Sequence, residues 1–306
     1  RKRVIPMTKL ATVAMHCDPH DKDLNFSKMV SFVEEAAEKG VDLLVFPEEC
    51  LTGFGTVPMN VFSPDDRMVH LAHAELVPEG PSTQAFAELA KKHDMYICWG
   101  MAEKDESRFD VTYNCAVFVG PEGYIGKYRK THLPLAERLT HHPGRGDYPV
   151  FDTRFGKVGI EICFDKCFPE VARCLAVEGA LIVLNPTAWP GDLETDRRVY
   201  DTLSAARAAE SMIFFIDSNH CGEIMPGCGS FMYGNSQVIS PIAGQVLATT
   251  GSNEGIAIAD VDIESEIVRA RTYSMGGSDL LRERKPATYG PLTAFSKYSV
   301  NQGTSE

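Results

Sequence analysis

The sequence predicts an α/β fold with layered sheets, and two observations support this prediction. Short, largely apolar segments such as residues 42–46 alternate with segments of helical periodicity such as residues 25–40. Continuous apolar strands need cover on both faces, which the helices between them can supply. The alternation runs along the chain without an obvious linker, so we expect one domain over residues 8–292 and a C-terminal tail over residues 293–306.

The first half of the chain is expected to hold five strands and two helices. Apolar residues from Phe26 to Ala37 follow helical spacing, and Gly40 is suited to end that helix. A turn at residues 121–123 joins the last two strands into a hairpin. The strands are expected at 9–15, 42–46, 95–100, 111–120 and 124–129, and the helices at 25–40 and 82–93.

The second half repeats this alternation. Pro169 is suited to the first turn of a helix, where its missing N–H is not needed. The segment after Val261 is charged and irregular, and could wrap its own domain or a neighbour. The strands are expected at 156–163, 180–184, 212–217, 231–240 and 256–261, and the helices at 169–178 and 196–209.

Composition and charge exclude several classes of protein. Lysine plus arginine total 30 against 42 acidic residues, a net charge of −12, and both nucleic acid and anionic membranes require a basic face. The sequence shows no apolar span of 18 residues and no apolar core of a signal peptide near its start. The nine cysteines are odd in number and show no CxxC spacing, which indicates reduced thiols in a cytoplasmic protein and no metal site.

Three apolar strands end in a polar side chain that could react. These side chains are Glu48 after residues 42–46, Lys130 after residues 124–129, and Cys163 at the end of residues 156–163. Strand ends hold such groups rigidly at an accessible rim.

Together, these three side chains suit acyl transfer. A lysine ammonium stabilises a nearby thiolate, and a carboxylate can instead take the thiol proton as a general base. The helix expected after Cys163 would offer backbone N–H groups to an oxyanion. The set therefore supplies a nucleophile, a base and a fixed positive charge.

The segments around these residues resemble the three signature blocks of the nitrilase superfamily of carbon–nitrogen hydrolases, in the family's order. Further segments agree, including Gly234-Asn-Ser-Gln-Val-Ile-Ser-Pro-Ile-Ala-Gly244, and the resemblance covers residues 8–292. The three blocks are Phe46-Pro-Glu48, Tyr128-Arg-Lys130-Thr-His-Leu and Gly159-Ile-Glu-Ile-Cys163-Phe-Asp-x-x-Phe-Pro-Glu170.

The resemblance implies a four-layer α-β-β-α sandwich that assembles as a homodimer or higher homo-oligomer and needs no cofactor. It implies that Cys163 is the nucleophile, Glu48 the general base and Lys130 the stabiliser of the tetrahedral intermediate. Many members carry a second glutamate six residues before a Pro-Gly, and Glu137 stands at that spacing here. A carboxylate beside Lys130 would keep the ammonium charged and oriented.

Other residues are rival candidates for these roles. Glu49 adjoins Glu48, but neighbours on a strand point to opposite faces, so we expect Glu49 to be solvated or structurally hydrogen-bonded. Cys167 could form a redox or metal pair with Cys163, but an incidental small residue is the simpler interpretation. Glu161 shares a strand face with Cys163, so a contact with the site and a buried structural role are both open.

The histidine pair His141-His142 could also hold a metal. We interpret it as part of a polar loop before Pro143-Gly144, because the sequence shows no His or Cys cluster that would complete a ligand set.

The expected activity is hydrolysis of a small carboxamide through a thioester on Cys163, with release of ammonia. Phe164-Asp165 follows the nucleophile, which resembles the amidase and carbamoylase branches, whereas Trp-Glu is common in members that act on nitriles. An N-carbamoyl amidohydrolase is the alternative; a nitrilase or a non-catalytic binding member is less favoured. The residues expected to bind substrate are Phe164, Asn185, Thr187, Trp189, Phe54 and His132.

Overall fold

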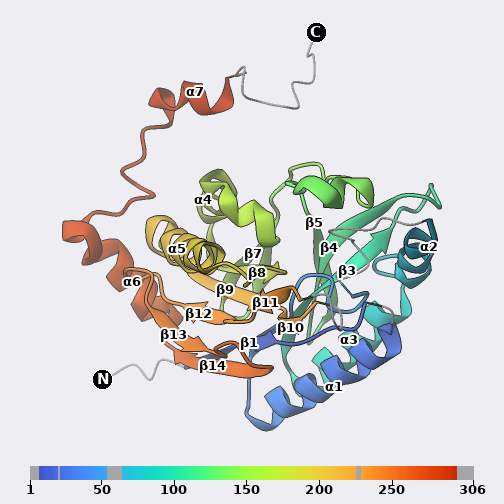
Figure 1. Cartoon of the computed structure of the whole chain (residues 1–306). Helices are drawn as coiled ribbons and strands as arrows, with labels where there is room; N and C mark the ends of the chain where they lie inside the picture. The colour runs from blue at the N-terminus through green and yellow to red at the C-terminus, as the bar shows by residue number, and fades with distance from the viewer. Residues whose placement is uncertain (1–6, 20, 54–63, 225–228, 295–306) are drawn as a thin grey trace.

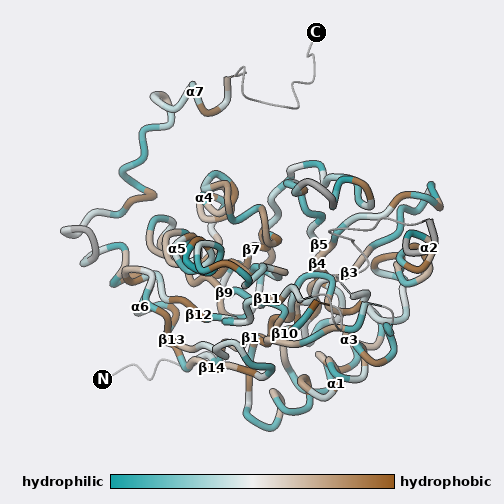
Figure 2. The backbone as a smooth tube through the Cα atoms, viewed as in Figure 1, coloured by the Kyte–Doolittle hydropathy of each residue, from teal (hydrophilic) through white to brown (hydrophobic). Residues whose placement is uncertain are grey.

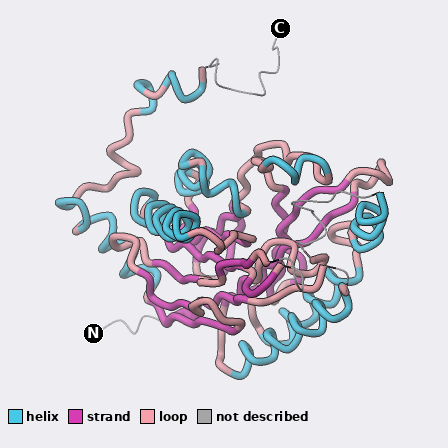
Figure 3. The backbone as a smooth tube through the Cα atoms, in the orientation of Figure 1, coloured by secondary structure: helices cyan, strands magenta, loops and turns pink. Residues whose placement is uncertain are grey.

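The chain folds into an α-β-β-α sandwich of four layers (Figure 1), which confirms the expected fold class. The computed structural model describes residues 7–19, 21–53, 64–224 and 229–294. Within these ranges, twelve strands form two six-stranded sheets that face each other. Figure 3 shows the helices on the two outer sides of the strands.

The first sheet has the order β14-β1-β2-β3-β4-β5. Its β1, β2 and β3 are parallel, whereas β3, β4 and β5 form an antiparallel meander that contains the predicted hairpin. The last strand of the chain, β14, closes the other edge antiparallel to β1. The bounds are β1 Thr8–Ala14, β2 Leu43–Val45, β3 Tyr96–Lys104, β4 Thr112–Gly120, β5 Gly123–Arg129 and β14 Gly255–Val261.

The second sheet has the order β13-β12-β9-β8-β7-β6. Its central strands β7, β8 and β9 are parallel, and antiparallel strands flank them on both sides. The bounds are β6 Val150–Thr153, β7 Gly156–Ile160, β8 Ala180–Thr187, β9 Phe214–Asn219, β12 Gln237–Ile239 and β13 Val246–Thr249, with β10 Cys221–Glu223 and β11 Phe231–Tyr233 forming a separate small sheet.

The helices cover the outer faces of the sheets. Helices α1 (Lys22–Glu38) and α3 (Pro81–His93) lie on the first sheet, and α4 (Pro169–Val177) and α5 (Glu194–Ser211) lie on the second. Figure 2 shows that hydrophilic and hydrophobic residues alternate along these helices, as expected for helices with one face on a sheet. No helix among the described residues combines the length and apolarity needed to cross a membrane.

Three separate hydrophobic cores correspond to the three interfaces between the four layers. The outer cores lie under α1 and α3, where Met29 and Phe86 are fully buried, and under α4 and α5, where Leu175 is fully buried. The middle core lies between the sheets. Its buried members include Leu43, Val45, Phe118, Ile160, Leu184 and Ile216.

Hydrogen bonds join the two sheets directly at the ends of their parallel strands. The Ser218 hydroxyl donates to the carbonyls of Val13 and Val45, at 2.7 and 3.0 Å, and the Thr12 hydroxyl donates to the Asp217 carbonyl at 2.6 Å. These buried bonds fix the strand ends of one sheet against those of the other.

Three sequence-based expectations need correction. The strand expected at 231–240 is two strands, β11 and β12, because Gly234 and Asn235 take positive φ of 68° and 50° between them. The strand expected to reach Cys163 ends at Ile160, and Cys163 opens the 3₁₀ turn η3 (Cys163–Cys167).

The third correction concerns the segment after Val261, which was expected to be irregular. It forms helix α6 (Ile263–Thr272), which begins where the Asp262 side chain accepts a hydrogen bond from the Ser265 N–H, and which buries Ile263 and Ile267. Beyond it, the short helix α7 (Gly290–Thr293) ends an exposed segment (Figure 1), and its Leu292 lines a surface pocket together with Pro169 and Arg173 of α4.

Candidate active site

The structure brings Glu48, Lys130 and Glu137 together at the ends of the strands. Glu48 follows β2, Lys130 directly follows β5, and Glu137 lies in the 3₁₀ turn η2 (Leu135–Leu139). The Lys130 Nζ lies 2.6 Å from Glu48 Oε1 and 2.7 Å from Glu137 Oε2, and all three side chains are at most 2% exposed. The ammonium group is therefore held between two carboxylates.

Asn114, on β4, completes this network and was not predicted. Its Nδ2 donates to Glu48 Oε1 at 2.6 Å and to Glu137 Oε1 at 2.7 Å, so one amide restrains both carboxylates. The signal in the sequence was an amide inside an otherwise apolar strand, because a buried polar side chain needs a partner.

Replacing Asn114 by leucine, which conserves volume, is expected to lower kcat about 10- to 100-fold, since a hydrogen bond to a charged group contributes about 1.5 to 3 kcal/mol. The comparison variant is Tyr113→Phe. Tyr113 lies on β4 next to Asn114, but its hydroxyl donates to Asp105, outside the network. Steady-state kinetics of both variants measure the effect, and equal kcat values would contradict it.

Cys163 lies at the turn from β7 into η3, with a strained backbone and a nearly buried thiol. Its φ is +47°, a left-handed value that is costly for a residue with a side chain, and it is 6% exposed. Burial and the charge of Glu48 raise the pKa of the thiol, and Lys130, the Thr187 hydroxyl and the Ala188 backbone lower it only in part. The thiol is therefore protonated at neutral pH in the free protein and needs a base before it can attack.

The charges of the carboxylates dominate the ionisation of Lys130. Burial alone would lower its pKa, but Glu137, Glu48 and Cys163 together raise the pKa of Lys130 well above its usual value. Burial also raises the pKa of Glu137, an effect that Lys130 opposes. Lys130 thus remains a cation throughout the ordinary pH range.

A buried carboxylate, Asp165, connects the segment of Lys130 with that of Cys163. It accepts hydrogen bonds from the Tyr128 hydroxyl at 2.9 Å, from the Ile162 N–H at 3.2 Å and from the His132 N–H at 2.9 Å. Its contacts explain why tyrosine, histidine and aspartate occur at these positions of the two blocks.

His132 was expected to bind substrate, but its ring is engaged in this connection. The His132 Nδ1 lies 2.7 Å from Asp165 Oδ1, and the ring stacks on Phe168 at 3.9 Å between centroids. His132 does not line the cavity described next.

A cavity of about 280 Å³ opens over these groups. Phe164 and Trp189, which were expected to bind substrate, line it, and the Trp189 indole N–H donates to the Asp196 carbonyl at 2.9 Å. Its walls are mostly apolar, with the thiol and the ammonium at its floor. The described residues that line it are Lys130, Pro134, Glu137, Cys163, Phe164, Ala188, Trp189, Pro190, Asp196, Ile224 and Met232.

The remaining residues expected to bind substrate are not among the described residues that line the cavity. Thr187 is buried next to the Cys163 thiol, whose pKa its hydroxyl lowers. Asn185 lies on β8 and its side-chain amide donates to the carboxylate of Asp217 on the neighbouring strand β9 at 2.5 Å. It does not line the cavity. Phe54 lies outside the described residues.

The rival residues also have defined surroundings. Glu49 is fully buried and hydrogen-bonded to His141 at 2.9 Å, which confirms a structural hydrogen bond rather than a solvated side chain. Glu161 is buried too, and burial raises the pKa of its carboxyl group well above the usual value. Cys167 is half-buried and carries a free thiol.

His141 lies in a loop, as expected, but its side chain is buried. It is 3% exposed, whereas its neighbour His142 is exposed. Burial lowers the pKa of His141 to about 4 and that of His70 to about 3, and burial raises the pKa of Glu49 to about 6. Both imidazoles are therefore neutral at pH 7.

Comparisons with known proteins agree with the fold and with the sequence blocks. The family model described as carbon-nitrogen hydrolase matches residues 9–270. A protein of Pyrococcus abyssi named nitrilase is 34% identical over 283 residues, covering 92% of this chain and 99% of its own. The human omega-amidase NIT2 is 30% identical over 268 residues, covering 84% of this chain and 89% of its own.

A solved structure has the same architecture. It is a mutant of the amidase from Nesterenkonia sp. AN1, described as showing covalent addition of the acetamide moiety of fluoroacetamide at the active-site cysteine. It is 23% identical, covers 94% of this chain and 98% of its own, and has a TM-score of 0.73.

The fold and these matches define a class of enzyme, the hydrolases of carbon–nitrogen bonds other than peptide bonds. The chain belongs to the carbon-nitrogen hydrolase family, within the nitrilase superfamily that its three sequence blocks resemble.

Proposed function

We propose that this enzyme hydrolyses a small carboxamide through a thioester on Cys163 and releases ammonia. The observation that carries the proposal is the buried ion network of Glu48, Lys130 and Glu137, in which Lys130 and Glu137 line the same cavity as Cys163. A thiol, a base and a fixed cation around one cavity are what acyl transfer requires.

Glu48 takes the thiol proton in the proposed first step. Its Oε1 is occupied by Lys130 and Asn114, whereas its Oε2 has no hydrogen-bond partner among the described residues. This free oxygen is available for the proton, and the raised pKa of the Cys163 thiol makes such a base necessary. The sulfur then attacks the amide carbonyl and forms a tetrahedral intermediate.

Lys130 and the Phe164 N–H stabilise the oxyanion of this intermediate. Glu48 returns its proton to the leaving nitrogen, the C–N bond breaks, ammonia leaves, and the thioester remains on Cys163. Water then loses a proton to Glu48 and attacks the thioester carbonyl. The carboxylic acid product leaves as the proton passes back to the Cys163 sulfur.

The cavity favours a small, uncharged acyl group. Its volume of about 280 Å³ suits a short chain, and Trp189, Ile224 and Met232 give it apolar walls. Lys130 is the single cation among the described lining residues, and it is already paired with two carboxylates. A substrate carboxylate would therefore have no cationic partner in the described wall.

A panel of neutral carboxamides, carbamoyl compounds and nitriles, assayed for ammonia and carbon dioxide, tests this proposal. Small neutral carboxamides are expected to give the highest kcat/KM and ammonia without carbon dioxide. Release of both products from carbamoyl compounds alone would establish the carbamoylase alternative. Turnover of nitriles alone would establish the nitrilase activity named for the Pyrococcus abyssi relative.

The proposal includes a cytoplasmic homodimer or higher homo-oligomer. Free thiols at all described cysteines support a reducing compartment. The exposed segment that ends in α7 carries the exposed apolar side chains of Tyr289 and Leu292, which supports contact with a second copy. Light scattering of the purified chain measures the oligomeric state.

A further inference from the structure

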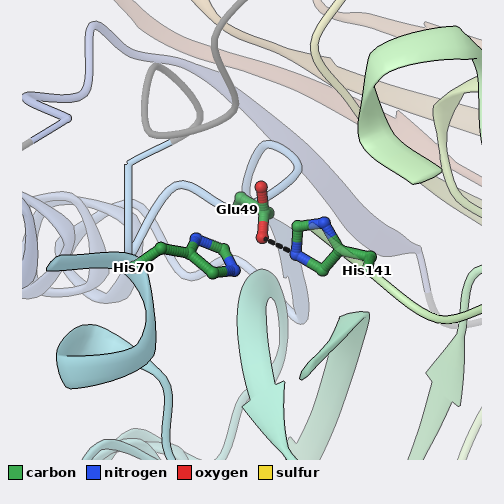
Figure 4. Close-up of side chains that lie close together, drawn as sticks. All are labelled: Glu49, His70 and His141. Atoms are coloured by element: carbon green, nitrogen blue, oxygen red, sulfur yellow. Dashed lines mark hydrogen bonds and ion pairs between the residues drawn. The ribbon is translucent and has the colours of Figure 1, made fainter. Parts of the chain in front are cut away.

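A second polar cluster lies beside the candidate active site and takes no part in the proposed reaction. It consists of Glu49 in the turn after β2, His70 in helix α2 (Pro64–His73) and His141 directly after η2. In Figure 4, the two imidazole rings flank the Glu49 carboxylate. One ligand atom from each residue lies within 4.8 Å of the others.

All three side chains are buried, with exposed fractions of 0%, 0% and 3%. The Glu49 Oε1 lies 2.9 Å from His141 Nε2, but the Glu49 Oε2 has no hydrogen-bond partner among the described residues. A buried carboxylate oxygen without a partner costs free energy, because its hydration is lost and not replaced. The cluster therefore lacks one favourable contact at its centre.

The other ring nitrogen of His141 is already held. Its Nδ1 lies 2.9 Å from the Thr140 hydroxyl, which turns Nε2 toward Glu49. A hydrogen bond at the remote nitrogen is the arrangement found for histidines that bind metals. The ring of His70 meets that of His141 edge-on, at 4.7 Å between centroids.

The balance of buried charge also favours a cation here. Three buried carboxylates, those of Glu48, Glu49 and Glu137, share one fully buried ammonium, that of Lys130. Among the described residues, the half-buried Arg67 is a second cation near Glu49, and its hydrogen bonds go to the Thr112 hydroxyl and the Asp110 carbonyl. A divalent ion at Glu49 would offset the remaining negative charge.

We infer that Glu49, His70 and His141 form a binding site for a divalent transition metal, with Zn²⁺ as the ion that this ligand set suits best. Two imidazoles and one carboxylate are a known ligand set for zinc, with bonds of about 2.0 to 2.2 Å. None of the three residues lines the cavity, so the ion would not touch substrate. It would brace the turn that carries Glu48 against the one that carries Glu137.

The test is metal binding by the full chain in the Cys163→Ala form, which removes the cavity thiol as a competing ligand. Chelator-stripped protein is titrated with Zn²⁺ by calorimetry and with Co²⁺ by visible absorption. One ion per chain, Co²⁺ bands of tetrahedral type, and a rise in Tm with Zn²⁺ are expected. Adding His141→Ala should weaken binding by at least about 100-fold, because loss of an outer partner alone costs about 10- to 100-fold.

The matched control is His142→Ala, since His142 is the next residue and is exposed. It should bind Zn²⁺ as the parent does. If His141→Ala does not fold, Glu49→Gln serves instead, because it keeps a hydrogen-bonding side chain but removes the charge. The inference would be overturned if the parent did not bind Zn²⁺, or if it bound no better than the folded His141→Ala or Glu49→Gln variant. The three residues would then form a hydrogen-bonded cluster without a metal. Neither result depends on the proposed substrate.

Discussion

Replacing Cys163 by alanine is expected to reduce kcat for amide hydrolysis by about 10⁴-fold or more, because loss of a nucleophile leaves only binding and oxyanion stabilisation. The fold should persist, since the thiol makes only weak polar contacts, with the Ala188 carbonyl at 3.9 Å and with the Thr187 hydroxyl. Ammonia release and the Tm of the purified variant measure the two effects. Activity equal to that of the parent would remove Cys163 from the mechanism.

Two other thiols serve as controls for this experiment. Cys167 lies in the same 3₁₀ turn and Cys174 is exposed on α4, and alanine at either position should leave kcat nearly unchanged. Iodoacetamide should label Cys174 whether or not substrate is present. Labelling of Cys163 should follow the loss of activity and should be prevented by substrate, which peptide mass spectrometry resolves.

Replacing Lys130 by methionine is expected to lower both stability and kcat. Two buried carboxylates would lose their shared cation, and breaking a buried ion pair costs about 3 to 5 kcal/mol in the free energy of unfolding. Loss of one oxyanion-stabilising group lowers kcat by about 10²- to 10³-fold. Denaturant unfolding and steady-state kinetics measure the two quantities.

A double variant separates these two roles of Lys130. Adding Glu137→Gln to Lys130→Met removes one of the two carboxylates, so part of the lost unfolding free energy should return. The kcat should stay low, because the positive charge is still absent. Recovery of kcat together with stability would show that Lys130 is structural rather than a stabiliser of the intermediate.

The sequence predicted the members of the site better than the contacts between them. Glu48, Lys130 and Cys163 each follow an apolar strand within three residues, which is a local signal, and the structure places Glu48 and Lys130 in direct contact. Asn114 gave only a weak signal, because its partners are 66 and 23 residues away in the chain. The network it completes is defined by strand pairing across β4, which periodicity does not reveal.

The strands and helices were predictable where a whole segment is apolar. They were less predictable where one or two residues determine whether an element begins or ends. The long apolar strands and most helices lie within a few residues of their expected positions. The break between β11 and β12 depends on the positive φ values of Gly234 and Asn235. Helix α6 begins at one capping side chain, that of Asp262, although the segment after it is rich in charged residues. The burial of the loop residue His141 was not predicted, because it comes from α2 and from Glu49, both remote in sequence.

The hydrogen bonds that Ser218 and Thr12 make between the two sheets hold the catalytic groups of one sheet in position against those of the other. One sheet supplies the carboxylates and the ammonium, and the other supplies the thiol, so neither half of the chain carries a complete catalytic apparatus. A small shift of one sheet relative to the other would separate the Cys163 thiol from Glu48 and Lys130, although the strand pairing within each sheet would be unchanged. Activity therefore depends on the relative position of the two sheets. On heating, the enzyme should lose activity at a lower temperature than that at which circular dichroism detects loss of secondary structure.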